Sequence, residues 1–217
     1  MKAPSIQVFE KFHRQYDRWF TRNKSVYWSE VEAIRRLIPK DGRGLEVGVG
    51  TGRFSTPFGI EIGLDPSRRM GFLAKKRGIQ VVCGVGEYLP FGDETFDFVL
   101  NVTTICFVQD PYATLKETRR VLKNHGSVII GFVDGDSKLG RFYESRKSES
   151  RFYGSAKFYS VEDLRRWLIE LCFNDFSIHQ TIFRFPHEVN SIEPIKEGYG
   201  EGGFIALRAK KKWIEGG

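Results

Sequence analysis

The feature that most constrains this chain is a run of three closely spaced glycines that follows a short apolar segment. Residues 44–49 read Gly-Leu-Glu-Val-Gly-Val, which is typical of a buried strand, and the glycines are Gly48, Gly50 and Gly52. Glycine allows positive φ angles and a close approach of the backbone to a ligand. In an open parallel sheet, ligands bind beyond the carboxyl ends of the strands. The segment therefore predicts an α/β fold with a ligand at this loop.

After this loop, strand-like and helical patterns alternate. Apolar strand-like runs lie at 60–64, 79–83, 96–101 and 127–133, and helical patterns lie at 67–77, 111–122 and 160–171. The alternation indicates a Rossmann-like, doubly wound sheet that is mostly parallel, with helices on both faces. The last two runs, 176–185 and 203–209, have no helix between them, so they should pair antiparallel at one edge. We expect seven strands, of which the last is antiparallel.

Two helices are expected before the first strand. Residues 5–20 place apolar side chains at helical spacing. Residues 29–38 read as a second helix, with Ser29 as its cap and Glu32 completing a capping box. A similar box at Ser160 begins the helix at 160–171.

The chain is expected to form a single domain with four parts. Its length of 217 residues suits one substantial core better than two. The parts are an N-terminal helical lid at 1–40, a cofactor-binding core at 41–133, an irregular substrate-side insertion at 134–159, and a C-terminal helix with an antiparallel strand pair at 160–217.

Composition argues against several classes of protein. No apolar run approaches the roughly 18–20 residues of a membrane helix, and no signal-type apolar core is present, so a cytoplasmic location is the default expectation. The cysteines, Cys83, Cys106 and Cys172, lack C-x-x-C spacing, which argues against a disulfide framework and a zinc site. No metal is expected.

Positive charge gathers at the N-terminus. The net charge is +7, and residues 1–40 hold nine Lys and Arg against four Asp and Glu, whereas 41–100 hold seven against eight. A basic segment can steer nucleic acid, but a solvated helix face is the interpretation that we favour.

The residues around the glycine loop help to identify its ligand. Arg53 stands where a dinucleotide fingerprint has its third glycine, and Glu46 precedes the loop. A carboxylate there disfavours a pyrophosphate and favours a ligand that carries an ammonium and a sulfonium. Asp65 ends the second strand, where it could accept both ribose hydroxyls of a nucleoside, or could serve as a turn residue before Pro66. Because Glu46 precedes the glycine loop as well, we favour the interpretation of Asp65 as a ligand-binding residue.

Five segments in order strengthen this interpretation: Leu45-Glu-Val-Gly-Val-Gly-Thr-Gly, Gly63-Leu-Asp-Pro-Ser, Gly84-Val-Gly-Glu-Tyr-Leu-Pro-Phe, Thr95-Phe-Asp-Phe-Val-Leu and Val121-Leu-Lys-Asn-His-Gly-Ser-Val-Ile-Ile. Together they resemble the class I S-adenosylmethionine-dependent methyltransferase domain of the small-molecule type. The resemblance covers about 45–133 and continues more loosely beyond. It implies S-adenosylmethionine as cofactor, S-adenosylhomocysteine as product and a small-molecule methyl acceptor.

The resemblance also implies roles for nine residues. Glu46, Gly48 and Gly50 would line the methionine part of the cofactor, Asp65 would bind the ribose, Pro66, Ser67, Gly86 and Glu87 would border the adenine, and Asn101 would offer its carbonyl to the cofactor amino group. Val85 departs from the family pattern, because many relatives have there an aspartate that binds the adenine amino group.

The acceptor side is less defined. A base is needed only if the acceptor must lose a proton, and the candidates are Asp134 after the fifth strand and His13 on the first helix; each would also suit a capping or surface role. An aromatic pocket under a lid could be formed by Tyr16, Trp19, Phe20, Tyr27, Tyr143 and Tyr153, for which ordinary packing is the alternative.

Other functions stay open at this point. An RNA methyltransferase would use the basic N-terminal segment and show steeply salt-dependent binding. A non-catalytic, cofactor-binding regulatory protein would need no further residues. A nicotinamide dehydrogenase is disfavoured by Glu46 and Arg53.

Overall fold

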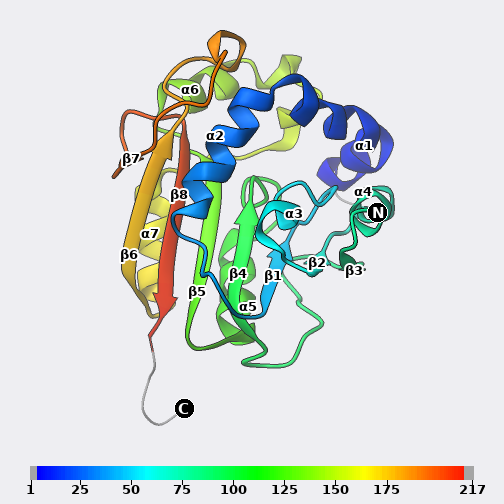
Figure 1. Ribbon diagram of the computed structural model, residues 1–217, viewed down its shortest axis with the longest axis vertical. Coiled ribbons are helices and arrows are strands. Elements are labelled where there is room, and N and C mark those ends of the chain that lie inside the picture. The colour runs from blue at the N-terminus through cyan, green and yellow to red at the C-terminus, as the bar shows by residue number, and fades with distance from the viewer. Residues whose placement is uncertain (1–3, 213–217) are drawn as a thin grey trace.

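The computed structural model describes residues 4–212, which contain one eight-stranded sheet in the order β3-β2-β1-β4-β5-β8-β6-β7 (Figure 1). The strands are β1 (Gly44–Val47), β2 (Ile62–Leu64), β3 (Gln80–Val82), β4 (Phe96–Val102), β5 (Leu122–Val133), β6 (Phe173–Thr181), β7 (Lys196–Glu197) and β8 (Phe204–Lys211). The first five strands are parallel, and β8 pairs antiparallel with both β5 and β6. The predicted Rossmann-like sheet is confirmed, and the two-residue β7 adds an eighth strand at its edge.

Helices cover both faces of this sheet. They are α1 (Pro4–Arg22), α2 (Lys24–Arg35), α3 (Ser55–Phe58), α4 (Arg68–Lys75), α5 (Pro111–Val121), α6 (Lys138–Ser145) and α7 (Val161–Glu170), with single 3₁₀ turns η1 (Lys147–Glu149), η2 (Tyr153–Ser155) and η3 (Pro186–Glu188). Apolar side chains of α5 and α7 build the core on one face, and those of α2 build it on the other. Figure 1 shows α1 lying above the carboxyl ends of the parallel strands, beside α4.

The N-terminal caps explain two helix boundaries. Ser160 accepts a hydrogen bond from the Asp163 backbone N–H, and the Asp163 carboxylate accepts one from the Ser160 backbone N–H, which confirms the predicted capping box of α7. Ser67 likewise caps α4 by accepting from the Met70 backbone N–H at 3.2 Å.

The start of the second helix was predicted wrongly. Helix α2 begins at Lys24, with only Asn23 between it and α1, so Ser29 lies inside it rather than at its cap. The Ser29 hydroxyl donates to the Ser25 carbonyl at 2.7 Å and accepts from the Glu193 backbone N–H at 2.8 Å. Ser29 therefore uses its hydrogen-bonding groups against a distant segment, which local spacing does not reveal.

The stretch 134–159 contains α6, η1 and η2, joined by irregular backbone. None of the helices within residues 4–212 is long and apolar enough to cross a membrane.

Candidate active site

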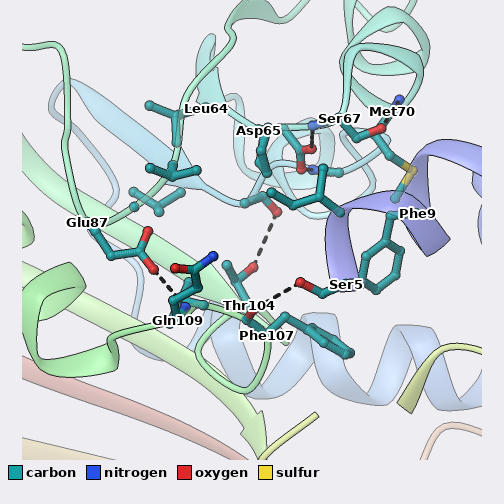
Figure 2. A pocket seen from close by; sticks show the side chains of 18 of the residues that line it. Ser5, Phe9, Leu64, Asp65, Ser67, Met70, Glu87, Thr104, Phe107 and Gln109 are labelled. Atoms are coloured by element: carbon teal, nitrogen blue, oxygen red, sulfur yellow. Dashed lines mark hydrogen bonds between the residues drawn. The ribbon is translucent and has the colours of Figure 1, made fainter. Parts of the chain in front are cut away.

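A first cavity of about 300 Å³ lies at the carboxyl ends of β1, β2 and β4, beneath the N-terminal part of α1 (Figure 2). Seven of the residues predicted to hold the cofactor line it: Gly48, Gly50, Asp65, Pro66, Ser67, Gly86 and Glu87. They come from the glycine loop, from the end of β2 and from the loop after β3. The parallel sheet thus gathers residues that are about 40 positions apart in sequence around one space.

Glycine is required at two positions of the loop. Gly48 has φ of 73°, and a Cβ there would overlap the side chain of Thr104, so the loop packs directly on the segment after β4. Gly50 has φ of 52°, and the nearest atom to a Cβ there is Met70 Cε at 3.6 Å. A side chain at Gly50 would therefore enter the cavity rather than the core.

Asp65 lies at the point where β2 ends, and its carboxylate borders the cavity (Figure 2). It accepts hydrogen bonds from the backbone N–H groups of Gly50 and Ser67, each at 2.8 Å. Burial raises the pKa of Asp65 to about 6, the two backbone donors act in the opposite direction, and the charge of Glu10 raises it further. The carboxylate is thus held in place at the strand end, where it suits the hydroxyl groups of a ribose.

The charges around the cavity are all negative. Asp65, Glu87 and Asp110 line it, and among the described residues that do so there is no Lys, Arg or His. Glu87 accepts from the backbone N–H groups of Gln109 and Asp110, at 2.7 and 3.2 Å, which fixes the loop before α5 (Figure 2). Such a lining disfavours a phosphate ligand and favours one with positive charge, because like charges repel at short range.

Two other predicted cofactor residues, Glu46 and Asn101, do not line this cavity. Glu46 is buried below the glycine loop, where it accepts a hydrogen bond from the Ser55 hydroxyl, and burial raises its pKa to about 8. Asn101 is paired with Ile130 inside the sheet, because β4 continues to Val102. The residues that border the cavity there are Val102, Thr103 and Thr104, so the strand ends one position later than predicted.

A second cavity, of about 390 Å³, adjoins the first. The two share Phe9, Tyr16, Thr103 and Phe107 as lining residues. The ring of Phe9 packs edge-on against those of Tyr16 and Phe107, with centroids 5.3 and 4.9 Å apart. Thr103 has φ of 48°, a left-handed backbone conformation that β-branched residues rarely adopt.

Aromatic side chains from α1, α6 and the segment after it form the walls of the second cavity. Of the aromatic residues predicted for an acceptor pocket, Tyr16, Trp19, Phe20, Tyr143 and Tyr153 line it. Tyr27 does not, because its hydroxyl donates to the Arg53 carbonyl at 2.6 Å and its ring packs against Phe20 and Phe54.

Glu30 also lines the second cavity and was not among the residues predicted for the site. A pattern in the sequence could have indicated this residue. Glu30 stands four residues after Val26 and four before Ile34, so it is a carboxylate on the apolar stripe of a helix. Phe142 and Phe152 were missed as well, and they line the same space.

The two bases predicted from the sequence lie outside the lining of both cavities. The carboxylate of Asp134 accepts from the Asp136 backbone N–H at 3.3 Å, in the turn before α6, and burial raises its pKa. Nδ1 of His13 lies 3.1 Å from the carbonyl oxygen of Glu10 on its own helix. Asp134 therefore contributes to a turn, and His13 contacts the backbone of its own helix.

Several known proteins are similar to this chain in sequence or in structure. Residues 45–130 match the family model described as "Methyltransferase domain". An uncharacterized protein of Methanocaldococcus jannaschii is 50% identical over 206 residues, which cover 95% of this chain and all of the relative. A crystal structure from Thermotoga maritima, of a SAM-dependent methyltransferase described as a possible histamine N-methyltransferase, has 49% identity and a TM-score of 0.93, and the match covers 96% of this chain and all of that one. The demethylmenaquinone methyltransferase of Anoxybacillus flavithermus is 34% identical over 224 residues, which cover 94% of this chain and 88% of the relative.

Proposed function

Because this chain belongs to the S-adenosylmethionine-dependent methyltransferases, we propose that it methylates a small molecule held in the second cavity. The observation that carries this proposal is the junction of the two cavities at Phe9, Tyr16, Thr103 and Phe107. One cavity holds the residues expected to bind the cofactor, and the other is an aromatic space of small-molecule size. Two ligands, one bound in each cavity, would lie next to each other at the four shared residues.

The first cavity suits S-adenosylmethionine chemically. The cofactor carries positive charge and no phosphate, in agreement with a lining that has carboxylates and no cation among the described residues. Asp65 would accept the ribose hydroxyls, and the backbone at Gly48 and Gly50 would lie against the methionine part. Pro66, Ser67, Gly86 and Glu87 would border the adenine.

Catalysis would rest mainly on positioning. The bound cofactor supplies a methyl group that its sulfonium already activates. The protein has to hold the acceptor in line with that group and keep water away, which can contribute roughly 7–11 kcal/mol in favourable cases. The rings of Phe9, Tyr16 and Phe107 at the junction would orient the acceptor and exclude water.

Calorimetric titration with S-adenosylhomocysteine tests the cofactor site. Stoichiometric binding is expected, and Asp65→Ala should weaken it at least tenfold because the ribose loses its acceptor. The matched control is Asp41→Ala, which removes an exposed carboxylate from the loop before β1 and should leave the affinity unchanged. Equal affinities for the two variants would contradict the assignment of Asp65.

Transfer itself is tested with methyl-labelled S-adenosylmethionine and a panel of small amines, phenols, thiols and quinols. Label is expected in at least one acceptor. Tight cofactor binding without transfer to any member of the panel would contradict the proposal and indicate a regulatory, cofactor-binding protein.

A further inference from the structure

Glu30 is a carboxylate in the wall of the second cavity. It lies in the middle of α2, is 8% exposed, and shares the cavity lining with Val26 one turn earlier. No hydrogen bond or ion pair to its side chain is found within residues 4–212. An unpaired carboxylate is costly to bury, so such groups are normally paired or kept neutral. Here burial alone raises the pKa of Glu30 to about 8.

The surroundings of Glu30 are aromatic. Rings from three segments of the chain line the same cavity: Tyr16, Trp19 and Phe20 from α1, Phe142 and Tyr143 from α6, and Phe152 and Tyr153 beyond it. The charge of Glu30 adds to the effect of burial in raising the pKa values of Tyr16 and Tyr143, so these phenols stay neutral. Aromatic faces attract cations, and the attraction increases when the cation is removed from water.

The other charged residues of this lining are already paired. Arg146 and Glu149 lie 3.9 Å apart, and their side chains are 61% and 68% exposed, so they belong to the outer edge of the cavity. Among the described lining residues, Glu30 therefore carries the one buried carboxyl group, and it has no partner. A cavity with aromatic walls and one buried, unpaired carboxylate lacks a positive partner.

We propose that Glu30 binds a positively charged nitrogen of the methyl acceptor, and that the acceptor is a small organic amine. The proposal rests on the proposed function, because it takes the second cavity as the acceptor site. An ammonium group would give the Glu30 carboxylate its missing hydrogen-bond donor and would lie among the rings that favour a cation. An uncharged acceptor would leave Glu30 without an ionic partner, so the carboxyl would keep its proton and form no charge-assisted hydrogen bond with the acceptor.

The experiment is a titration of the full chain, saturated with S-adenosylhomocysteine, with arylalkyl amines of the size of 2-phenylethylamine. Each amine is compared with the alcohol of the same skeleton, such as 2-phenylethanol. At least one amine should bind, its alcohol should bind at least thirtyfold more weakly, and Glu30→Gln should weaken binding of the amine at least tenfold. The affinity for S-adenosylhomocysteine should stay within twofold of wild type in this variant, which shows that the fold is kept.

Glu32→Gln is the matched control, since it removes a more exposed carboxylate from the same helix, and Glu32 lines neither cavity. Its effect on amine binding should stay below threefold. An alcohol that binds as tightly as its amine, an unchanged amine affinity in Glu30→Gln, or no binding by any amine would overturn the proposal. Failure of the proposed function would look different, because wild type would then bind no S-adenosylhomocysteine or transfer no label to any class of acceptor.

Discussion

The guanidinium of Arg53 donates to both carboxylate oxygens of Asp17, with Nε 2.9 Å from Oδ1 and Nη2 3.0 Å from Oδ2. Arg53 follows the glycine loop, whereas Asp17 belongs to α1. The same carboxylate accepts from Arg77 at 2.9 Å and from the Thr51 hydroxyl at 2.8 Å. Burial tends to raise the pKa of Asp17, but the donors Arg53 and Thr51 and the charge of Arg77 outweigh it, so the pKa lies below its usual range. This cluster ties the helix above the cavity to the loop that forms its floor.

Replacement of Asp17 by Asn should therefore destabilise the protein. The variant loses charge-assisted hydrogen bonds and leaves two guanidinium groups facing each other, so we expect a loss of about 2 kcal/mol in the free energy of unfolding. Urea denaturation at pH 7 measures it. Glu32→Gln is the control, because the Glu32–Arg35 pair is exposed and should contribute less than about 0.5 kcal/mol. Equal effects in the two variants would show that the cluster does not hold α1.

Arg53 also shows why the sequence predicted the fold better than the site. Its identity distinguished the loop from a dinucleotide fingerprint, which is a local pattern. Its partner Asp17 lies 36 positions earlier, and no periodicity links the two. Seven of the eight strands, the glycine loop and the α7 capping box were predicted because each depends on residues close together in sequence.

The acceptor side depends instead on packing between distant segments. The sequence puts Glu30 on the apolar stripe of a helix, but only the packing of α1 and α6 shows that it borders a cavity. Asn101 was predicted to end the strand at 96–101, whereas pairing with β5 extends β4 to Val102. Its buried side-chain amide has no hydrogen-bond partner within the described residues, a feature that sequence alone does not predict.

Two glycines with similar φ angles, Gly48 and Gly59, allow the cost of backbone strain to be separated from the cost of a steric overlap. Gly48 and Gly59 have φ of 73° and 66°, but a Cβ at Gly59 meets nothing within 4 Å, whereas one at Gly48 overlaps Thr104. Gly59→Ala should cost only the left-handed strain, about 1–2 kcal/mol of stability, and leave binding of S-adenosylhomocysteine unchanged. Gly48→Ala should cost more and weaken binding at least tenfold, because the loop must move. Denaturation and calorimetry measure the two effects, and identical binding by both variants would contradict the role given to Gly48.

Binding of S-adenosylhomocysteine should depend on pH through Asp65. The pKa of Asp65 in the free protein is raised to about 6, and the ionised carboxylate is the better acceptor for ribose hydroxyls. The affinity should therefore decrease as the pH falls from 7.5 to 5, by up to about tenfold per unit below the pKa. Asp65→Asn should bind more weakly at pH 7.5 and lack this dependence between pH 5 and 7. Calorimetry across the range decides it, and a variant that keeps the wild-type slope would assign the titration to another group.

Glu30 should make the wild-type protein less stable at alkaline pH than its Gln variant. The carboxyl has an ordinary pKa of 4.5, and burial raises it to about 8 in the folded state, so the folded protein holds this proton more tightly than the unfolded chain does. The stability from that difference is fully present below about pH 4.5 and is lost as the pH rises to about 8.

Glu30→Gln has no proton to lose there, and the buried Glu46 and Asp65 titrate in both proteins, so their effects cancel in the difference. We expect the free energy of unfolding of Glu30→Gln, relative to wild type, to increase by more than about 1 kcal/mol between pH 5 and 8.5, since one unit of pKa shift corresponds to about 1.4 kcal/mol. Urea denaturation of both proteins without ligands measures it, and parallel curves would mean that Glu30 ionises as freely as an exposed carboxylate.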